Sequence, residues 1–472
     1  MGRAGKALLI GVCLALGLFL PSGEVEQGTI EATGKPNIVF ILTDDLDVAS
    51  VSKMPALDEY MADEGVTFDN AFVTESLCCP SRASILTGQY PHNHLVRRNS
   101  PPLGGFESFR DLDREDSTIA TWLDGAGYET ALFGKYLNGY GLRHRVYIPP
   151  GWDEWYAAVG DRVLNHDGKP TKYPEESYHD DVLSGLAQDF VRRQEGSEKP
   201  FFMYLSVHAP HEPANPAPRH EELVKGLRAP RTPAFDEVNT SDKPKWVKRS
   251  SLSSEEKRYI DQLYRDRLRT MVAVGEMIGG LMRTLREAGE LDNTYLIFTS
   301  DNGYHMGQHR LSNGKNTAYE EDIRIPLMIR GPGVPAGAER DEMVLNNDFA
   351  PTFADLAGLP QRASVDGRSF APLLDDKAAN DPASWRTAFE VRYWNDEEGG
   401  APSYDAVRTQ RYLYVEYETG EHELYDLRED PYELRNLDDS ADETLVSELD
   451  SRLDTLRDCS GEECRTAENA QP

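Results

Sequence analysis

The sequence predicts an α/β protein with a large, mostly parallel sheet flanked by helices and a smaller C-terminal antiparallel sheet. Continuous apolar and β-branched runs at 36–43, 199–207 and 294–299 are typical of strands buried on both faces of a parallel sheet. Strand and helix patterns alternate up to about residue 375, as expected for a parallel sheet covered by helices. After residue 376 the pattern changes to short alternating runs separated by turns, which predicts a small antiparallel sheet.

The individual elements follow from hydrophobic periodicity and from the residues that end each pattern. Short apolar runs predict strands of the main sheet at 36–43, 66–73, 128–133, 199–207, 294–299 and 326–330. Helical spacing, with proline favoured at a first position and glycine at a C-terminal cap, predicts helices at 54–64, 80–87 and 255–289. The Pro-rich and charged stretch 212–250 is expected to be a long surface excursion. The smaller unit is expected to contain strands at 386–393, 404–409, 411–417 and 423–427 and a helix at 442–457.

The chain of 472 residues exceeds one ordinary domain, which suggests one large domain and one smaller one. We expect five segments, divided by composition: a signal peptide at 1–23, a linker at 24–35, a main domain at 36–375, a small α+β subdomain at 376–458 and a polar tail at 459–472.

The N-terminus has the pattern of a secretory signal. Arg3 and Lys6 precede an apolar run at 7–20 that is too short for a typical membrane span. We expect cleavage near Gly23 and a secreted or extracytoplasmic protein with no membrane association afterwards. An uncleaved anchor is the alternative.

The formal charge of −31 excludes some partners. A strongly acidic chain argues against nucleic-acid binding and favours a soluble extracellular protein. It also repels anionic ligands at long range, so any anion site must carry its own local positive charge.

Five cysteines are present, and only one pair is suited to a disulfide. Cys13 lies in the expected signal, and the neighbours Cys78 and Cys79 rarely reach bridge geometry. Cys459 and Cys464 lie close together near the C-terminus and could form a small disulfide in an exported chain, or remain two free thiols.

The most informative stretch is 77–88, which has the sequence L-C-C-P-S-R-A-S-I-L-T-G. Cys78 lies beside Arg82 at an expected helix start, a position that predicts a lowered thiol pKa and a site for an anion. The structural alternative is a buried cysteine pair at an ordinary loop-to-helix junction.

Oxygen ligands follow two of the predicted central strands. Asp44 and Asp45 end the first strand, and Asp301 and Asn302 end the strand at 294–299. Ligands bind at the carboxyl ends of strands in open α/β sheets, so these side chains are expected to meet. Hard oxygen donors suit Ca²⁺, or Mg²⁺, rather than zinc.

Cationic and titratable residues complete the expected site. Arg82, Lys135 and Lys315 could clamp an oxyanion inside an acidic protein. His211, in the turn H-A-P-H, is a candidate to donate a proton to a leaving oxygen or to hold the bound oxyanion. His208 in the same turn is expected to be a capping or core histidine.

The pattern C-x-P-S-R-x-x-x-L-T-G at 78–88 resembles the signature of the sulfatase family. Three further runs are similar to the N-acetylglucosamine-6-sulfatase branch: G-K-Y-L-N-x-Y at 134–140, P-G-W at 150–152 and S-D-N-G-Y-H-x-G-Q at 300–308. The resemblance covers residues 36–375, and 424–437 is also sulfatase-like.

The resemblance implies an alkaline phosphatase/sulfatase-like fold in which 36–375 is the catalytic domain. It implies that a formylglycine-generating enzyme oxidises Cys78 to formylglycine, whose hydrate attacks sulfur. It also implies a Ca²⁺ site formed by Asp44, Asp45, residue 78, Asp301 and Asn302. The remaining motif positions correspond to family residues around the sulfate and the reacting oxygens: Arg82, Lys135, His211, Lys315 and, as a proton acceptor, Asp301.

One departure from the family leaves a role open. Many sulfatases have a histidine two or three residues after the lysine matched by Lys135, where this chain has Leu137 and Asn138. His94, His211 or a carboxylate could serve as the base that completes turnover.

The expected activity is therefore hydrolysis of a sulfate ester, on a sulfated carbohydrate such as N-acetylglucosamine 6-sulfate or on an aryl sulfate. A phosphonate monoester hydrolase of the same superfamily is one alternative. An inactive protein that binds sulfated glycans is an alternative of another class.

Overall fold

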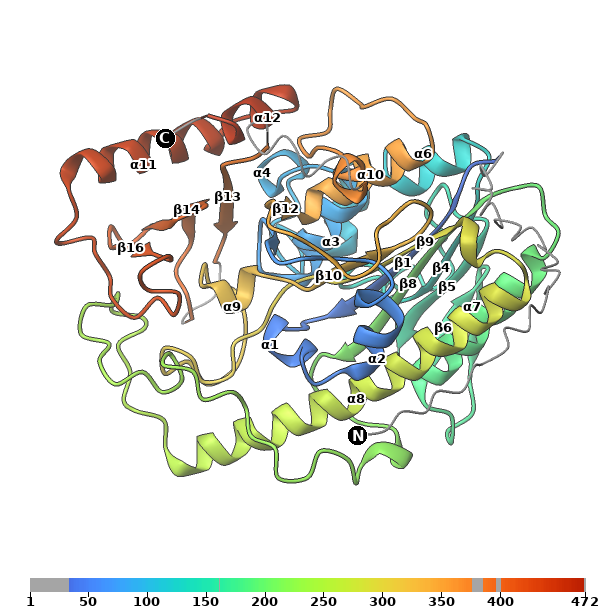
Figure 1. Ribbon diagram of the computed structural model, residues 1–472, viewed down its shortest axis with the longest axis horizontal. Coiled ribbons are helices and arrows are strands. Elements are labelled where there is room, and N and C mark those ends of the chain that lie inside the picture. The colour runs from blue at the N-terminus through green and yellow to red at the C-terminus, as the bar shows by residue number, and fades with distance from the viewer. Residues whose placement is uncertain (1–33, 161, 376–384, 396–399, 471–472) are drawn as a thin grey trace, which may run out of the picture. The chain divides into compact units, whose positions relative to one another are not determined.

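A ten-stranded mixed sheet forms the centre of the structure, a computed structural model that describes residues 34–160, 162–375, 385–395 and 400–470. The strand order is β11-β2-β10-β9-β1-β8-β4-β5-β6-β7. The five strands from β9 to β5 are parallel, whereas β10, β6 and β7 pair antiparallel with their neighbours (Figure 1). The predicted fold class is confirmed, with antiparallel pairing on both sides of the five parallel strands.

The strands of this sheet are β1 (Asn37–Asp44), β2 (Val66–Phe68), β4 (Glu129–Gly134), β5 (Glu154–Gly160), β6 (Val163–His166), β7 (Lys169–Lys172), β8 (Phe201–Pro210), β9 (Thr294–Ser300), β10 (Leu327–Arg330) and β11 (Ala338–Arg340). Strands β5 to β7 have no counterpart among the predicted elements. For β7 (K-P-T-K) the reason is that it is exposed throughout and lacks an apolar pattern, whereas β5 is largely buried and was missed.

Strand β1 shows why its sequence is apolar without alternation. Phe40 and Leu42 belong to the hydrophobic cluster on one face of the sheet, and Val39 and Ile41 to the cluster on the other. Both neighbours are parallel to β1 and pair with it along its length. Because β1 is a central strand buried on both faces, its last residue, Asp44, lies at the carboxyl end of the sheet and is itself buried.

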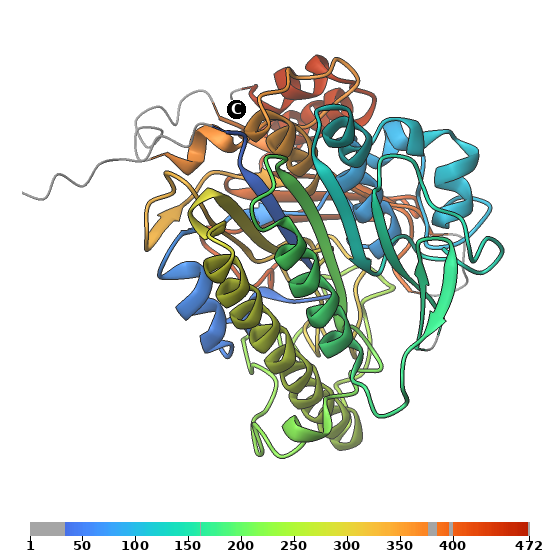
Figure 2. The same ribbon diagram turned by 90° about the vertical axis from the view of Figure 1, so that its right-hand side faces the viewer.

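Helices α7 (His179–Gln194) and α8 (Ser254–Glu287) pack side by side over one face of the sheet (Figure 2). Helix α8 begins with a capping box between Ser253 and Glu256, and its buried residues include Met271 and Ile278. Its predicted length is confirmed to within two residues at each end.

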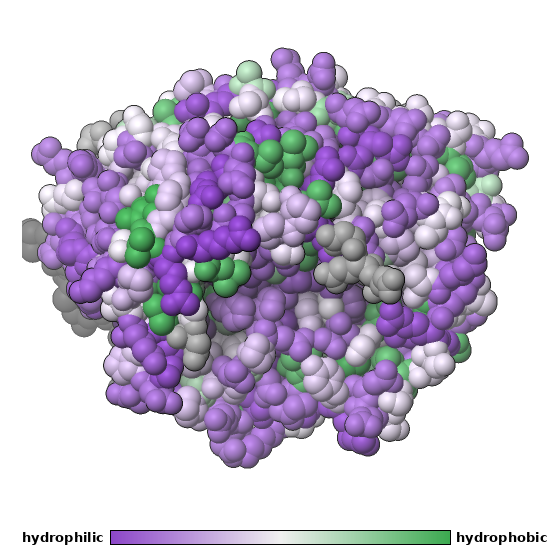
Figure 3. All heavy atoms as spheres, turned by 180° about the vertical axis from the view of Figure 1, so that it is seen from behind, coloured by the Kyte–Doolittle hydropathy of each residue, from purple (hydrophilic) through white to green (hydrophobic). Residues whose placement is uncertain are grey.

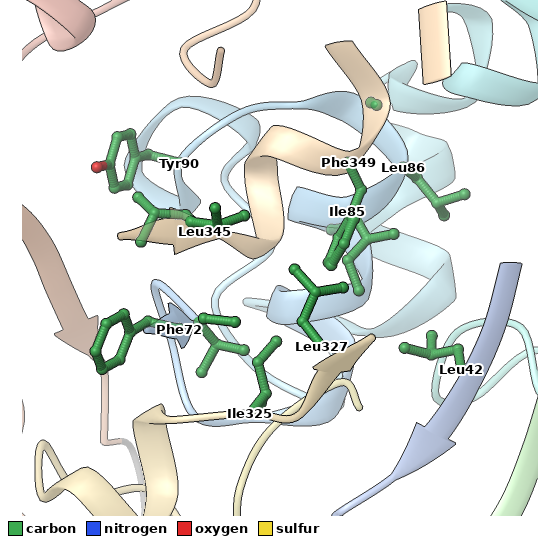
Figure 4. Close-up of a cluster of buried hydrophobic side chains, with 14 of the residues drawn as sticks. Leu42, Phe72, Ile85, Leu86, Tyr90, Ile325, Leu327, Leu345 and Phe349 are labelled. Carbon is green, nitrogen blue, oxygen red and sulfur yellow. The ribbon is translucent and has the colours of Figure 1, made fainter. Parts of the chain in front are cut away.

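The opposite face is covered by helix α3 (Cys78–Thr87), α6 (Ile119–Gly125) and α10 (Phe349–Leu356). Figure 4 shows Ile85 and Leu86 of α3 beside Phe349 of α10, above Leu327 of β10 and Leu42 of β1. Gly88 ends α3 in the left-handed region at φ +72°, as its sequence predicts. This packing fixes the helix whose first residue is Cys78.

The remaining helices are short: α1 (Val48–Val51), α2 (Pro55–Leu57), α4 (Pro91–His94), α5 (Gly105–Asp111), α9 (Glu320–Ile323), the π-helix η1 (Asp58–Ala62), and the 3₁₀ helices η2 (Arg114–Asp116), η3 (Pro218–His220), η4 (Leu291–Asn293), η5 (Asn346–Asp348) and η6 (Ala371–Leu374).

The single strand expected at 66–73 is two strands in two sheets. It is divided between β2 and β3 (Ala71–Phe72), and β3 pairs with β12 (Val344–Leu345). The break falls at Asp69 and Asn70, where the Asn70 side chain donates to the carbonyl of Asp341 at 2.8 Å. Polar side chains that bond to a neighbouring backbone disfavour continuation of a strand.

The C-terminal part contains the predicted four-stranded antiparallel sheet, with strands in sequence order: β13 (Ala388–Tyr393), β14 (Tyr404–Thr409), β15 (Tyr412–Tyr417) and β16 (His422–Asp426). Helix α11 (Glu443–Arg457) packs against β13 and β14.

The segment expected to be a polar tail instead contains helix α12 (Glu462–Glu468). Cys459 and Cys464 form a disulfide, and Glu468 is fully buried. Arg386 and Arg368 both pair with the Glu468 carboxylate, so the tail is attached to the body of the protein by buried charges that a composition-based argument does not detect.

The surface reflects the composition. On the face shown in Figure 3, hydrophilic residues predominate and apolar ones form only small patches. Over the described part of the chain, no helix has both the length and the apolar character of a membrane span. The expected signal peptide and most of the expected linker lie outside the described residues.

Candidate active site

The carboxyl ends of β1 and β9 form one side of the site. Asp44 ends β1, and Asp45 follows in the left-handed region at φ +66°, so the two carboxylates leave the strand in different directions. Both side chains are buried. Arg267 of α8 donates hydrogen bonds to the carbonyl of Asp45 and to Asp47 Oδ2, the latter at 3.2 Å, which holds this turn in place.

The second pair of predicted metal ligands lies directly beside the first. The parallel pairing of Thr43 with Ser300 places the residues that follow β9 next to those that follow β1. The Asp45 backbone N–H donates to Asp301 Oδ1 at 3.0 Å, and Asn302 Nδ2 donates to Asp45 Oδ1 at 2.8 Å. The four oxygen-bearing residues expected to meet therefore lie together.

Cys78 lies against these carboxylates at the first position of α3. Its Sγ atom is 3.4 Å from Asp44 Oδ1 and 3.8 Å from Asp45 Oδ1, and the side chain is fully buried. Lys315 Nζ is 2.8 Å from the same sulfur and also contacts the Asp45 carboxylate. Residues from α3, β1 and the loop after β9 therefore converge on one sulfur atom.

The Cys78 thiol differs from the sequence-based prediction in its acidity. Burial raises the pKa of the Cys78 thiol well above its ordinary value, and the positive charges of Lys135 and Lys315 offset only part of this effect. The prediction of a lowered pKa was wrong because it considered the neighbouring cations and the helix start but not the complete loss of solvent. A thiol whose pKa is raised by burial forms little thiolate, which is the nucleophilic form.

Three cations surround the carboxylates, as predicted. Arg82 Nε donates to Asp301 Oδ2 at 2.8 Å, and Arg82 Nη1 donates to Ser206 Oγ at 2.7 Å. Lys135 Nζ lies 2.5 Å from Asp44 Oδ2. Each cation therefore has a carboxylate partner, and the three positive and three negative side chains cancel formally.

The carboxylates of Asp44 and Asp301, at the ends of β1 and β9, differ in pKa. Burial acts to raise the pKa of Asp44, but the charge of Lys135 and the hydrogen bond from His208 outweigh it and hold that pKa well below its ordinary value. For Asp301, burial and the negative charge of Asp44 raise the pKa despite the presence of Arg82. Asp301 is therefore the more basic of the two carboxylates.

Two histidines after β8 extend over the carboxylates. His211 Nε2 lies 3.6 Å from Asp45 Oδ2, close to where the sequence predicts a proton donor. His208 Nδ1 lies 3.1 Å from Asp44 Oδ2, and nearly half of its side chain is exposed. The prediction of a core or capping role for His208 was wrong, because β8 runs on to Pro210 and carries His208 to the same sheet edge.

His94 is separate from this group. It is fully buried, its Nε2 lies 3.0 Å from Ser84 Oγ, and its Nδ1 accepts from the Val96 N–H. Leu137, one of the two positions at which the resemblance implies a histidine, is buried in the core. Of the bases considered from the sequence, His211 and the carboxylates lie at the site and His94 does not.

Two cavities reach the site, and His211 lines both of them. One of about 410 Å³ is lined by Lys315, Tyr304 and Trp246, among others. The other, of about 470 Å³, is lined by Lys135, His208 and Asp180. Polar and aromatic linings of this size accommodate a sugar or an aryl group beside the charged cluster.

The donor set fits a divalent cation. Asp44, Asp45, Cys78 and His211 each place a donor atom within 4.8 Å of the others. Asn302 Oδ1 is buried and has no hydrogen-bond partner among the described residues, so it keeps an oxygen available for an ion. Asp44, Asp45 and Asn302 offer oxygen atoms, the donors that Ca²⁺ and Mg²⁺ prefer.

Three residues that position the site were not found from the sequence. Ser206 holds Arg82, Arg267 holds the Asp45 turn, and Asn346 Nδ2 donates to Ser81 Oγ at 2.9 Å. Ser206 and His208 could have been found from their place at the end of a predicted strand. Arg267 and Asn346 are distant in sequence and carry no motif.

Comparison with known proteins shows the family. A sequence profile of the sulfatase family matches residues 36–359, and a profile described as N-sulphoglucosamine sulphohydrolase, C-terminal, matches residues 307–459. The chain therefore belongs to the sulfatase family, and it is an enzyme that hydrolyses sulfate esters.

The relatives extend the match over most of the chain. It is 34% identical to N-acetylglucosamine-6-sulfatase of Capra hircus, covering 93% of this chain and 86% of that protein. It is also 34% identical to an arylsulfatase of Chlamydomonas reinhardtii, covering 92% and 76%.

Two solved structures share the fold. One, described in complex with its substrate D-glucosamine-2-N,6-O-disulfate, has a TM-score of 0.76 and 28% identity and covers 93% of this chain and 100% of that one. A phosphonate monoester hydrolase from Silicibacter pomeroyi has a TM-score of 0.70 and 24% identity, covering 88% and 94%, which is a likeness of fold alone.

Proposed function

We propose that this enzyme removes 6-O-sulfate from glucosamine-type sugar units, with formylglycine formed from Cys78 and a bound Ca²⁺. Relatives with that activity in their names align over most of the chain, and the structure of similar fold was solved with a disulfated glucosamine. The catalytic domain in this proposal spans 36–375, and 376–458 forms a subdomain beside it.

The observation that carries the proposal is the position of Cys78. A neutral, buried thiol held 2.8 Å from Lys315 Nζ and 3.4 Å from Asp44 Oδ1 is unsuited to act as a thiolate. The same position suits an oxygen nucleophile. A hydrated formylglycine would supply a hydroxyl there that attacks sulfur.

Asp44, Asp45, Asp301 and Asn302 would hold the metal ion, together with residue 78. A bound Ca²⁺ would polarise a sulfate oxygen and neutralise the carboxylates. Because three cations and three carboxylates already cancel, a divalent ion would leave the site positive inside an acidic protein. That local charge is what an anionic sulfate ester requires.

The remaining residues act on the substrate directly. Arg82 is fixed by Asp301 and Ser206, and Lys135 and Lys315 would exchange part of their contact with the carboxylates for contact with sulfate oxygens. Asp301, with its raised pKa, would accept the proton of the attacking hydroxyl. His211, at the junction of the two cavities, would donate a proton to the leaving sugar oxygen.

The cellular setting is part of the proposal. We expect export by the N-terminal signal and action outside the cytoplasm, after modification by a formylglycine-generating enzyme. A relative from Drosophila melanogaster named as an extracellular sulfatase homologue is 37% identical over 76% of this chain, although the match covers only 33% of that protein.

A panel of esters tests the substrate. Protein purified from a host with the modifying enzyme is assayed with N-acetylglucosamine 6-sulfate, the 3-sulfate isomer, an aryl sulfate and an aryl phosphonate. We expect kcat/KM to be highest for the 6-sulfate. Equal rates on both isomers would overturn the positional assignment, and a higher rate on the phosphonate would favour the phosphonate monoester hydrolase.

A binding experiment separates the enzyme from the glycan-binding alternative. Sulfated glucosamine that binds with Ca²⁺ present but releases no sulfate, from protein with modified residue 78, would contradict the proposal.

A further inference from the structure

We propose that His309, Glu321 and Glu433 form a second metal site, separate from the Asp44 cluster. It would take a divalent transition ion of the zinc class. The three residues come from the loop after β9, from α9 and from the segment after β16. One donor atom from each lies within 4.8 Å of the others.

His309 offers one free ring nitrogen in a fully buried position. Its Nδ1 lies 2.8 Å from Glu237 Oε2, and its ring stacks on Tyr319 with centroids 4.1 Å apart. Its Nε2 is buried and has no hydrogen-bond partner among the described residues. A buried imidazole nitrogen without a partner is costly unless a ligand occupies it.

The two carboxylates show the same feature. Glu433 is 1% exposed, and its Oε2 accepts from the Glu320 N–H at 3.1 Å, while its Oε1 has no partner among the described residues. Glu321 Oε2 is likewise buried and unpartnered. Each of the three residues, which come from three separate segments, therefore has one buried donor or acceptor atom without a partner among the described residues.

The nearby cation does not account for these atoms. Lys243 is buried, but it donates to the Tyr425 hydroxyl at 2.8 Å and to the carbonyl of Glu433, and its Nζ is 3.9 Å from Glu237 Oε2. An ion between the two carboxylates would supply a positive charge that Lys243 does not deliver to these atoms.

The neighbouring Glu320 is excluded from the set because its carboxylate is already paired. It pairs with Arg324 Nη2 at 2.5 Å and with Arg408 Nε at 2.8 Å.

The donor types select the ion. Ca²⁺ prefers six or more oxygen ligands, whereas one imidazole and two carboxylates suit Zn²⁺ and its neighbours among the divalent metals. Glu237 receives the Nδ1–H of His309, the arrangement that typically orients a metal-binding histidine. The chemistry at this site therefore differs from that of the oxygen-rich Asp44 cluster.

The consequence of binding would be mechanical. His309 and Lys315 lie in the same loop between β9 and α9, and Glu433 belongs to the C-terminal part. An ion shared by His309, Glu321 and Glu433 would tie the loop that carries Lys315 to the small antiparallel sheet.

Zinc stoichiometry of the full-length enzyme tests the site. The protein is treated with chelator, saturated with CaCl₂ so that the Asp44 cluster is filled, and dialysed against ZnCl₂, and bound zinc is measured by elemental analysis. We expect one zinc per chain in the wild type and loss of that zinc in Glu433→Gln and His309→Gln. The wild type should also melt at a higher temperature with zinc, and these two variants should not.

Two further variants separate ligation from folding. Glu237→Gln keeps all three ligands and should keep the stoichiometry while weakening zinc binding by about 10- to 100-fold. His220→Gln is the matched control, because His220 is also a buried histidine, with Nε2 2.9 Å from Glu276 Oε1, and lies outside the cluster. Its zinc binding should be unchanged.

The proposal is overturned if the calcium-saturated wild type takes up no zinc. It is equally overturned if Glu433→Gln and His309→Gln bind as much zinc as His220→Gln does.

Discussion

Two buried clusters of charged side chains in this protein look alike in composition and differ in what they leave unused. At the C-terminal end, Arg386 contacts both oxygens of Asp348 at 2.6 and 2.9 Å and Glu468 at 2.9 Å. Tyr90 occupies the other Glu468 oxygen. In the active site, Arg82 Nη2 and Asn302 Oδ1 have no hydrogen-bond partner among the described residues.

The difference separates a structural cluster from a catalytic one. Around Arg386, each carboxylate oxygen of Asp348 and Glu468 and each guanidinium nitrogen of Arg386 has a partner, so these three side chains hold α12 and the strand β13 in place. In the cluster around Arg82, a buried donor and a buried acceptor remain unused, at Arg82 Nη2 and Asn302 Oδ1. Buried polar atoms without partners are expected where a ligand completes the set.

The largest expected loss of activity follows from removing the reacting side chain, Cys78, from the active site. Cys78→Ala should lower kcat/KM for the preferred sulfate ester by at least about 10⁴-fold, as loss of a nucleophile does in other enzymes. Cys79→Ala, which changes the adjacent buried cysteine, should stay within about tenfold of the wild type. Sulfate release is measured under identical conditions, and equal activity of the two variants would contradict the role of residue 78.

Breaking the C-terminal cluster should affect stability instead. Arg386→Met leaves Asp348 buried without its cation and Glu468 paired with Arg368 alone, and the free energy of unfolding should fall by about 3–5 kcal/mol. Arg411→Met, which removes an exposed partner of Asp426, should leave the denaturation midpoint almost unchanged. Urea unfolding measures both. The catalytic rate per folded molecule of Arg386→Met should equal that of the wild type. A loss of kcat without a loss of stability in this variant would contradict the purely structural role of the Arg386 cluster.

Removing one cation from the active site should lower activity and leave stability largely unchanged, the reverse of what is expected for Arg386→Met. Lys315→Ala should lower kcat by about 10²–10³-fold, as loss of one group that stabilises a transition-state charge does. The matched control is Lys257→Ala, because Lys257 pairs with Asp236 away from the site. Steady-state kinetics on both variants provide the test, and a change confined to KM would limit Lys315 to ground-state binding.

The smallest effect concerns the disulfide beside the C-terminal cluster. Cys464→Ser opens a loop whose ends are only 5 residues apart. Closure of so short a loop restricts the unfolded chain modestly, so the loss of stability should be about 2 kcal/mol. Unfolding of the variant and of the wild type is compared under oxidising conditions, and a loss as large as that in Arg386→Met would show that the bridge, not the ion cluster, holds α12.

The sequence predicts the part of the site that local pattern determines. The apolar run before Asp44, the helix ended by Gly88 and the strand before Asp301 each have a signal of their own, and parallel pairing brings their ends together. Arg267 and Asn346 act through contacts across more than 220 residues, and no local signal identifies them. The acidity of Cys78 was predicted in the wrong direction because the depth of burial depends on the whole fold.

The same limit explains the C-terminal end. Residues 459–472 are polar in composition, yet α12 is held by Arg386, whose partner Asp348 lies in a different part of the chain. A polar composition predicts that a segment is exposed to solvent, but this prediction fails where its charged side chains pair with buried partners elsewhere in the fold.

The most direct test of the account is the mass of the peptide that contains Cys78, from enzyme made in a host with the modifying enzyme. The account predicts that the thiol has been replaced by an aldehyde at Cys78 and that Cys79 is unchanged. An intact Cys78 thiol in protein that nevertheless hydrolyses sulfate esters at full rate would contradict it.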